Sequence, residues 1–324
     1  MNILQIINII VLTFVLYECI IMISRNYLIN NIIIKEMVIV AKLTIPCAYQ
    51  GGKQRIAKQV VEIIQQYINN NNSDNIKFYD MCCGSGAISI ELVNQGFNPD
   101  NIIMVDKSPW GLFWKMIGDT TFSMDIFKYW IDSIPSDINK IKDYAKELII
   151  KPANDDGFNN MVYKFLFLQA CAFGSTATWV ENNIWRKAGG LRNYWLPTTT
   201  SSRRSPVNPM MPMPNTLYQR VQELSFGMEG VKGYYGDCND IHIEENSIIY
   251  IDPPYINTSG YGFEFDYMKF IDKHKINNII LLSEGMKLSD NNYNLTDRRS
   301  KGGISGERKK KANEEWLNVF GKVS

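Results

Sequence analysis

The sequence predicts an α/β fold in which a core with an open sheet is interrupted by a largely helical insertion. Three observations predict it. A short apolar strand at residues 76–81 leads through a glycine-rich turn into a helix. A second apolar strand, at residues 247–251, ends abruptly at two prolines. Between the two strands, residues 110–232 have the pattern of helices and long polar loops. We therefore expect the core at residues 37–110 and 231–324, and the insertion at residues 111–230.

The composition allows a sizeable core and limits the kinds of site. The chain has 324 residues and a net charge of +1, so any surface for nucleic acid must be local. Its six cysteines have no CxxC spacing, and it has two histidines. A zinc site or a disulfide framework is not expected, which suits a reducing compartment such as the cytoplasm. We expect no metal.

The first 36 residues differ from the rest, because residues 3–23 are almost wholly apolar. This length suits a membrane anchor, which would leave the rest of the chain on the cytoplasmic side. A packing helix is a second interpretation. The third, which we favour, is that residues 1–36 are upstream sequence and that Met37 is the natural start, because Asn8 and Glu18 interrupt the apolar run. Membrane association is then not expected.

A short glycine motif precedes the first helix of the expected core. Tyr49, Gly51, Gly52 and Lys53 come directly before apolar residues that share one helical face. Glycines let a ligand approach the backbone, and a lysine beside a helix N-terminus attracts an anionic group. An ordinary loop has the same pattern, so the motif alone is weak.

The strand at residues 76–81 and its glycine turn favour a nucleoside ligand. A turn of this kind brings a ligand against bare backbone at a helix start. The residues of the motif are Asp80, Cys82, Gly84, Ser85 and Gly86. Asp106 ends the next strand, where an acid can accept both hydroxyls of a ribose, although a surface turn would also explain it. The third glycine of a dinucleotide fingerprint is absent, so NAD is not favoured.

The insertion contains helices at residues 137–149 and 161–173, followed by a basic stretch. No Asp or Glu occurs between residues 182 and 220, where basic residues alternate with aromatic and hydroxyl residues. This mixture suits contacts with phosphates and bases, and its alternative is a loop that covers the core. The candidate DNA-binding residues are Arg186, Lys187, Arg192, Arg203 and Arg204.

The tetrapeptide Asp252, Pro253, Pro254 and Tyr255 follows the second apolar strand. Prolines lack an N–H and fix φ, so they hold the flanking groups rigidly at the end of the strand. Asp252 and the Pro253 carbonyl can accept the hydrogens of a planar amine such as that of adenine, and Tyr255 offers a ring for stacking. Asp237, before this strand, could accept hydrogens from a bound adenosine.

In this order, the motifs resemble those of the Dam-like (alpha-group) DNA adenine N6-methyltransferases. The resemblance spans roughly residues 45–318, and the stretch from Arg299 to Trp316 is similar to the C-terminal pattern of the family. It implies a Rossmann-like class I methyltransferase sheet, with S-adenosylmethionine bound by the first motif and the glycine turn. It also implies a target-recognition region inserted before the DPPY strand. Met81 and Cys82 depart from the Pro-Phe that is frequent in the family.

The expected activity is methyl transfer to N6 of an adenine flipped out of double-stranded DNA. We expect a monomer in the cytoplasm, or in the host cytoplasm if the source is viral. Two alternatives stay open. One is a methyltransferase for another amine or amide: RNA adenine, cytosine N4 or protein glutamine. The other is a DNA-binding protein that has lost catalysis.

Overall fold

The computed structural model describes residues 42–70, 75–192, 212–253, 265–295 and 314–321. The chain divides into two compact units, Met1–Lys42 and Leu43–Ser324. The first unit lies almost entirely outside the described residues, and so does the apolar segment at residues 3–23. In the part of the chain that is described, no helix is both long and apolar enough to cross a membrane.

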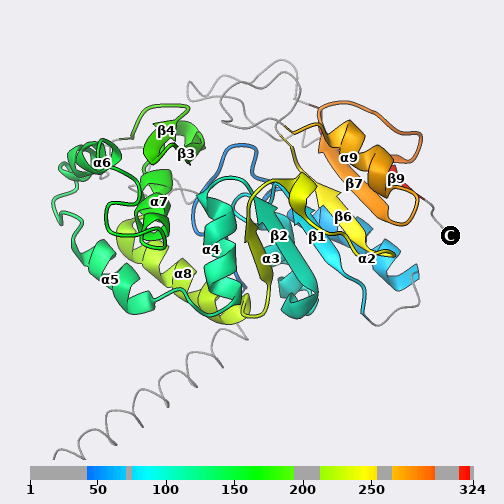
Figure 1. The fold of residues 1–324 in the computed structure, drawn as a ribbon, viewed down its shortest axis with the longest axis horizontal. Helices are drawn as coiled ribbons and strands as arrows, with labels where there is room; N and C mark the ends of the chain where they lie inside the picture. The colour runs from blue at the N-terminus through cyan, green and yellow to red at the C-terminus, as the bar shows by residue number, and fades with distance from the viewer. Residues whose placement is uncertain (1–41, 71–74, 193–211, 254–264, 296–313, 322–324) are drawn as a thin grey trace, which may run out of the picture. The chain divides into compact units, whose positions relative to one another are not determined.

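The second unit is a mixed α/β structure around a mostly parallel sheet of seven strands (Figure 1). The strand order is β5-β2-β1-β6-β7-β9-β8. The first five strands in this order pair in parallel, whereas β9 runs antiparallel to both of its neighbours. The strands are β1 (Phe78–Met81), β2 (Ile102–Asp106), β5 (Lys232–Tyr235), β6 (Ile248–Ile251), β7 (Ile279–Glu284), β8 (Asn292–Asn294) and β9 (Trp316–Phe320). The predicted α/β class is confirmed, and the sheet is compatible with a Rossmann-like fold.

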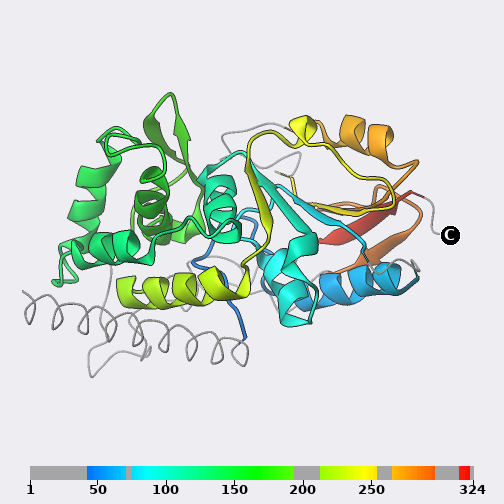
Figure 2. The same ribbon diagram turned by 60° about the horizontal axis from the view of Figure 1, so that its bottom comes forward.

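The central strands are short apolar runs because helices cover both faces of the sheet. Every residue of β1, β2 and β6 is buried. Figure 2 shows α2 (Ala57–Asn70) and α3 (Ala87–Asn94) on one face and α9 (Tyr267–His274) on the other. Tyr267, Phe270 and Ile271 of α9 pack on alternate residues of the strands, among them Ile249 and Ile251. This alternation leaves Asp80 and Tyr250 for the opposite face.

Helices and a hairpin occupy the described residues between β2 and β5. They are α4 (Pro109–Gly118), α5 (Met124–Asp132), α6 (Ile141–Ile149), α7 (Met161–Ala170), β3 (Thr178–Glu181), β4 (Ile184–Lys187) and α8 (Pro214–Gly227). Every residue of α7 is buried, as its apolar sequence predicts. Because residues 43–324 form one compact unit, the expected boundaries at residues 110 and 231 stay a prediction.

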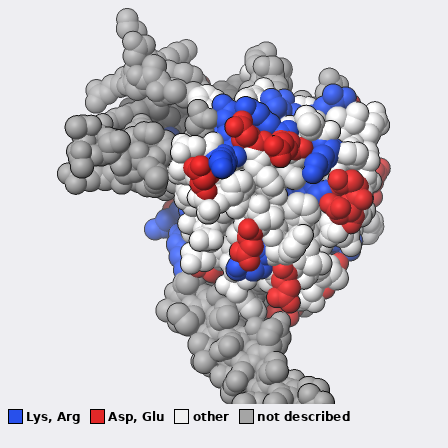
Figure 3. Space-filling model, turned by 90° about the vertical axis from the view of Figure 1, so that its left-hand side faces the viewer, with Lys and Arg blue, Asp and Glu red and all other residues white. Residues whose placement is uncertain are grey.

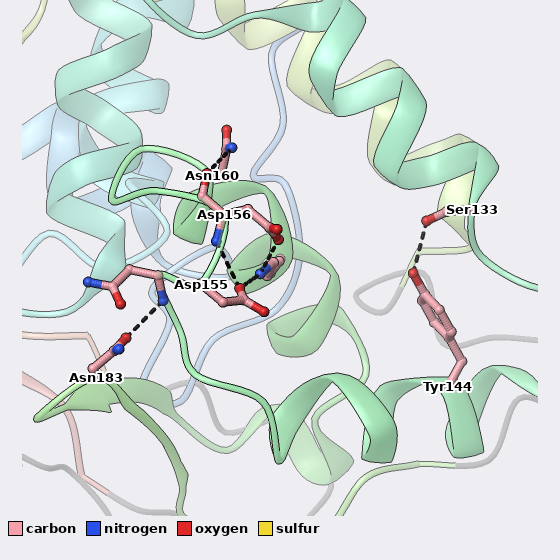
Figure 4. Close-up of polar contacts among 8 residues, drawn as sticks. Ser133, Tyr144, Asp155, Asp156, Asn160 and Asn183 are labelled. Atoms are coloured by element: carbon pink, nitrogen blue, oxygen red, sulfur yellow. Dashed lines mark hydrogen bonds and ion pairs between the residues drawn. The ribbon is translucent and has the colours of Figure 1, made fainter.

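Polar contacts fix the loop that leads into α7 (Figure 4). Lys164 of α7 is buried and pairs with Asp155 and with Asp156, the latter at 2.7 Å. Its ammonium also lies 5.2 Å from the centre of the Trp130 ring of α5. Asn183, at the tip of the hairpin, accepts the N–H of Asn154 at 2.8 Å. The lysine therefore joins α5, α7 and the loop between α6 and α7.

Candidate functional site

The candidate residues gather at the carboxyl ends of the parallel strands. From β1 the chain passes to β2 on one side, and later to β6 on the other side, so the strand order reverses between β1 and β6. Ligands of open α/β sheets bind at such a switch point, outside the carboxyl ends of the strands. The glycine turn follows β1 and Asp252 follows β6, so these two motifs flank the switch point.

The turn after β1 is built from residues in the left-handed region. Cys82, Gly84 and Gly86 have φ of 61°, 50° and 77°. The turn opens α3, whose Ser89 donates a hydrogen bond of 2.6 Å to Asp80. Ser85 is also buried. Burial raises the pKa of Asp80 to about 7, against the opposing hydrogen bond from Ser89.

Two aromatic rings lie against the glycines of this turn. A Cβ on Gly84 would stand 2.8 Å from the Tyr49 ring, and one on Gly86 would stand 2.4 Å from the Trp114 ring. The Trp114 indole also donates a hydrogen bond of 2.9 Å to the Gly84 carbonyl. The two glycines therefore make room for aromatic rings of the chain itself. The sequence had suggested only that they make room for a ligand. Trp114 lies within a plain apolar helix, so its sequence gave no signal of this contact.

Asp106 is buried at the end of β2 and accepts two backbone hydrogen bonds. Its Oδ2 accepts the N–H of Gly84 at 2.7 Å, and its Oδ1 accepts the N–H of Ser108 at 2.8 Å. Burial raises the pKa of Asp106, whereas a hydrogen bond from the Ser108 side chain and the backbone hydrogen bonds from Ser108 and Gly84 oppose the shift. An ionised carboxylate has about four acceptor positions, so capacity remains for hydroxyl groups of a ligand.

Asp237 is more fully engaged than its sequence suggests. Its Oδ1 accepts both the backbone N–H and the side-chain amide of Asn239, each at 2.9 Å. Its Oδ2 pairs with Lys107 at 3.0 Å. The hydrogen bonds of Asn239 and the Lys107 ammonium lower the pKa of Asp237. The carboxylate caps a short turn after β5, and little of its capacity remains for an adenine amine.

Lys53 contacts Asp252 directly. The Lys53 Nζ lies 2.6 Å from Asp252 Oδ1, and it also donates to the Gly51 carbonyl at 3.0 Å. Gly52 closes the same loop, because its N–H bonds the Tyr49 carbonyl at 3.0 Å. The sequence predicted that Lys53 attracts an anionic group, and in the structure this group is the carboxylate of Asp252. The first motif and the DPPY motif meet at this ion pair.

The electrostatics of Asp252 are set by burial and by several charges. Burial raises its pKa to about 6, the Lys53 ammonium opposes this shift, and the Glu315 and Glu284 carboxylates add to it. Burial therefore outweighs the direct contact with Lys53. Pro253 is buried beside Asp252. Pro254 and Tyr255 lie outside the described residues.

Two further carboxylates face this part of the site, and sequence reasoning assigned neither of them a role. Glu284 ends β7, is buried, and accepts the Tyr267 hydroxyl at 3.2 Å. Glu315 directly precedes β9 and lies 3.8 Å from the Lys53 Nζ. The sequence marked Glu284 only by its place at a strand end, whereas Glu315 lies within the stretch from Arg299 to Trp316 that was noted for its resemblance. Within the described residues, no group of His, Cys, Asp and Glu side chains is arranged to hold a metal ion.

The basic residues that were expected to contact DNA differ in exposure where the structure describes them. Arg186 and Lys187 are exposed on β4, and Arg186 pairs with Glu181 at 3.1 Å. Arg192 is buried, with only 6 % of its surface exposed, and donates to the Pro212 carbonyl. Arg203 and Arg204 lie outside the described residues. Among the described residues, Figure 3 shows basic and acidic side chains mixed over one face of the molecule.

Two thiols lie close together beside the glycine turn. Cys82 Sγ is 3.9 Å from Cys238 Sγ, and both cysteines are free. The hydrogen bond with Cys238 and burial raise the pKa of the Cys82 thiol. The Cys82 thiol is therefore held in its protonated form, in which thiols react slowly.

The chain was compared with protein-family models and with curated proteins, and neither comparison found a match.

Proposed function

We propose that the chain is an S-adenosylmethionine-dependent DNA adenine N6-methyltransferase. The observation that carries this proposal is the position of Asp252, which stands at the end of β6 across the switch point from the glycine turn of β1. Asp252, which can accept hydrogens from an amine, and the glycine turn, which suits a nucleoside, thus lie on either side of the switch point. The sheet, with one reversed strand near its edge, is compatible with the class I methyltransferase fold.

The residues at the sheet edge fit the proposed cofactor. Asp106 keeps acceptor capacity after its two backbone hydrogen bonds and would hold the ribose hydroxyls. Tyr49 and the turn from Cys82 to Gly86 would line the nucleoside, whereas Asp237 is less available because Asn239 and Lys107 engage it. When bound, S-adenosylmethionine supplies an electrophilic methyl group.

The chain's own contribution is to orient the amine that receives the methyl group. Asp252 in its ionised form accepts an N–H hydrogen and stabilises the positive charge that develops on nitrogen. The Pro253 carbonyl is a second acceptor, and Tyr255 remains the predicted stacking ring. Because N6 is not accessible to the pocket within a duplex, the adenine must be flipped out. Arg186 and Lys187 are the described candidates for contact with the DNA backbone.

The test is expression of residues 37–324 in a host that lacks adenine methylation, with N6-methyladenine mapped across its genome by single-molecule sequencing. We expect methylation within a short sequence motif. Asp252→Ala should abolish methylation and largely preserve affinity for S-adenosylmethionine, because Asp252 contacts the amine. Equal loss of both would show that Asp252 mainly builds the cofactor pocket.

The remaining outcomes separate the alternative functions. Soluble protein that binds S-adenosylmethionine but leaves DNA unmethylated would direct the search to RNA adenine, cytosine N4 or protein glutamine. Failure to bind the cofactor, together with salt-dependent DNA binding, would indicate a DNA-binding protein without catalysis.

A further inference from the structure

The reversed direction of β9 brings a carboxylate to the functional edge of the sheet. Since β9 is antiparallel to β7, its first residues lie beside the last residues of β7, and Trp316 is paired with Glu284. Glu315 immediately precedes this pair. A residue at the beginning of β9 therefore meets groups at the ends of β6 and β7.

Glu315 is held on both its backbone and its side chain. Its carbonyl accepts the N–H of Leu295 at 2.8 Å. Its Oε1 accepts the hydroxyl hydrogen of Ser283 at 2.7 Å, and Ser283 is completely buried. The same oxygen lies 3.8 Å from the Lys53 Nζ. The Lys53 ammonium thus lies between two carboxylates and is closer to Asp252, at 2.6 Å.

This arrangement poses a problem for the proposed reaction. The Lys53 ammonium donates to the carboxylate that should accept hydrogens from the substrate amine. It competes for those acceptor positions and also reduces the negative charge that stabilises the developing cation. The lysine has a flexible four-carbon stem, so its ammonium can move between neighbouring acceptors if a second counter-ion is available.

We propose that Glu315 is a positioning residue of this site, which takes over the Lys53 ammonium and so leaves Asp252 able to accept the hydrogens of the substrate amine. The inference rests on the proposed function. Ser283 holds the receiving carboxylate in place, and burial makes an unpaired ammonium too costly to leave behind. Lys53 therefore exchanges one carboxylate for the other as the amine binds.

Several charged or titratable groups surround Asp252 besides Lys53 and Glu315. They are Asp80 from β1, Cys82 from the glycine turn, Tyr250 from β6 and Glu284 from β7. Besides Asp252 itself, Glu315 lies within ion-pair distance of Lys53 in the described part of the chain. Glu315 also raises the pKa of Asp252, so its removal should lower that pKa.

The test compares wild type with Glu315→Gln, which keeps the size and an acceptor oxygen for Ser283 but removes the charge. Glu314→Gln is the matched control, because Glu314 contacts the exposed side of Trp316. We expect Glu315→Gln to lower kcat about 10- to 100-fold, as misplacement of a catalytic group does. The KM for S-adenosylmethionine should change little, and the acid limb of the activity profile should move to lower pH.

A second measurement does not depend on methyl transfer. The pKa of Asp252 is followed by carboxyl ¹³C NMR in protein with labelled aspartate, with the signal assigned by Asp252→Asn. We expect a lower pKa in Glu315→Gln and no change in Glu314→Gln. Ser283→Ala should produce a smaller loss of kcat, because Glu315 keeps its charge but loses its anchor.

The outcomes separate this inference from the proposed function. Active wild type with unchanged kcat in Glu315→Gln would overturn the inference and leave the function standing. A fall in kcat with an unchanged pKa of Asp252 would also overturn it, because Glu315 would then act only on the fold. Wild type without activity on any amine substrate would overturn the function, and the positioning role with it.

Discussion

Asp80 is a carboxylate whose burial opposes its own ionisation. Its side chain is 2 % exposed, and its pKa of about 7 lies well above the ordinary value of 3.8. Between these two pH values the folded chain keeps a proton that the unfolded chain has lost. The contribution of Asp80 to stability is therefore present at low pH and is lost as the pH rises towards 7.

Asp80→Asn should stabilise the ligand-free protein at pH 8 by up to about 4 kcal/mol, because it removes the buried charge and keeps an acceptor for Ser89. At pH 5 the gain should largely disappear. Urea unfolding at the two pH values measures the difference. Ser89→Ala is the control, and it should destabilise the protein more at pH 8, where the carboxylate needs the hydrogen bond. An equal effect of Asp80→Asn at both pH values would contradict the assigned ionisation.

Gly86 combines a left-handed backbone with a close aromatic neighbour, so its replacement should have two costs. In Gly86→Ala the new methyl would meet the Trp114 ring and Met104, and the variant should lose roughly 2–5 kcal/mol of unfolding free energy. Gly96→Ala is the matched control, because Gly96 has φ of 91° but no atom within 4 Å of its Cβ position. It should lose only the backbone part, about 1–2 kcal/mol. Similar losses in thermal unfolding would show that the ring contact is unimportant.

At the scale of elements, polar contacts fix how the helices between β2 and β5 are joined. Asp155 and Asp156 lie in the loop before α7 and keep 32 % and 51 % of their side-chain surface exposed, whereas Lys164 is buried. If the lysine were removed, the carboxylates could be hydrated where they stand. The contact therefore orders the loop more than it stabilises the whole protein.

Lys164→Met should lower the unfolding free energy by less than about 2 kcal/mol, because no isolated buried charge is left behind. Hydrogen exchange in residues 151–160 should nevertheless become clearly faster. Lys146→Met is the control, since Lys146 forms an exposed pair with Asp143 and should change neither quantity. Unaltered exchange in the loop would exclude this ordering role.

At the scale of the whole molecule, the chain from Leu43 onward folds as one unit, and its first residues are part of it. The backbone N–H of Leu43 donates to the Asn94 side-chain oxygen at 2.8 Å, and the Leu43 carbonyl accepts from the Asn94 amide nitrogen at 3.0 Å. The Leu43 side chain packs against Gly227. A chain that begins at Met37 keeps all of these contacts.

A protein that begins at Met37 should therefore unfold within about 2 °C of the full chain in a thermal scan. A protein that begins at Gln50 loses Leu43, Ile45 and Cys47 from the core and should unfold at a much lower temperature. If the Met37 protein is unstable while the full chain is not, residues 1–36 contribute to the fold.

Local signals were enough to predict the strands that carry the motifs. The apolar run before Asp252 and the glycine turn after residue 81 each depend on neighbouring residues, so β6, β1 and the start of α3 could be predicted. The pairing of Lys53 with Asp252 and the burial of Arg192 depend on contacts between distant segments. Periodicity does not encode the order of strands in a sheet, so these contacts could not be predicted.

The place of β9 in the sheet also affects when the protein can fold during synthesis. β8 pairs with β9 and has no other partner in the described sheet, although it precedes β9 in the chain. On the ribosome, β8 must wait until residues 316–320 have emerged before it can join the sheet. Glu315 arrives with them, so the contact between Glu315 and Lys53 also forms only after this segment has emerged.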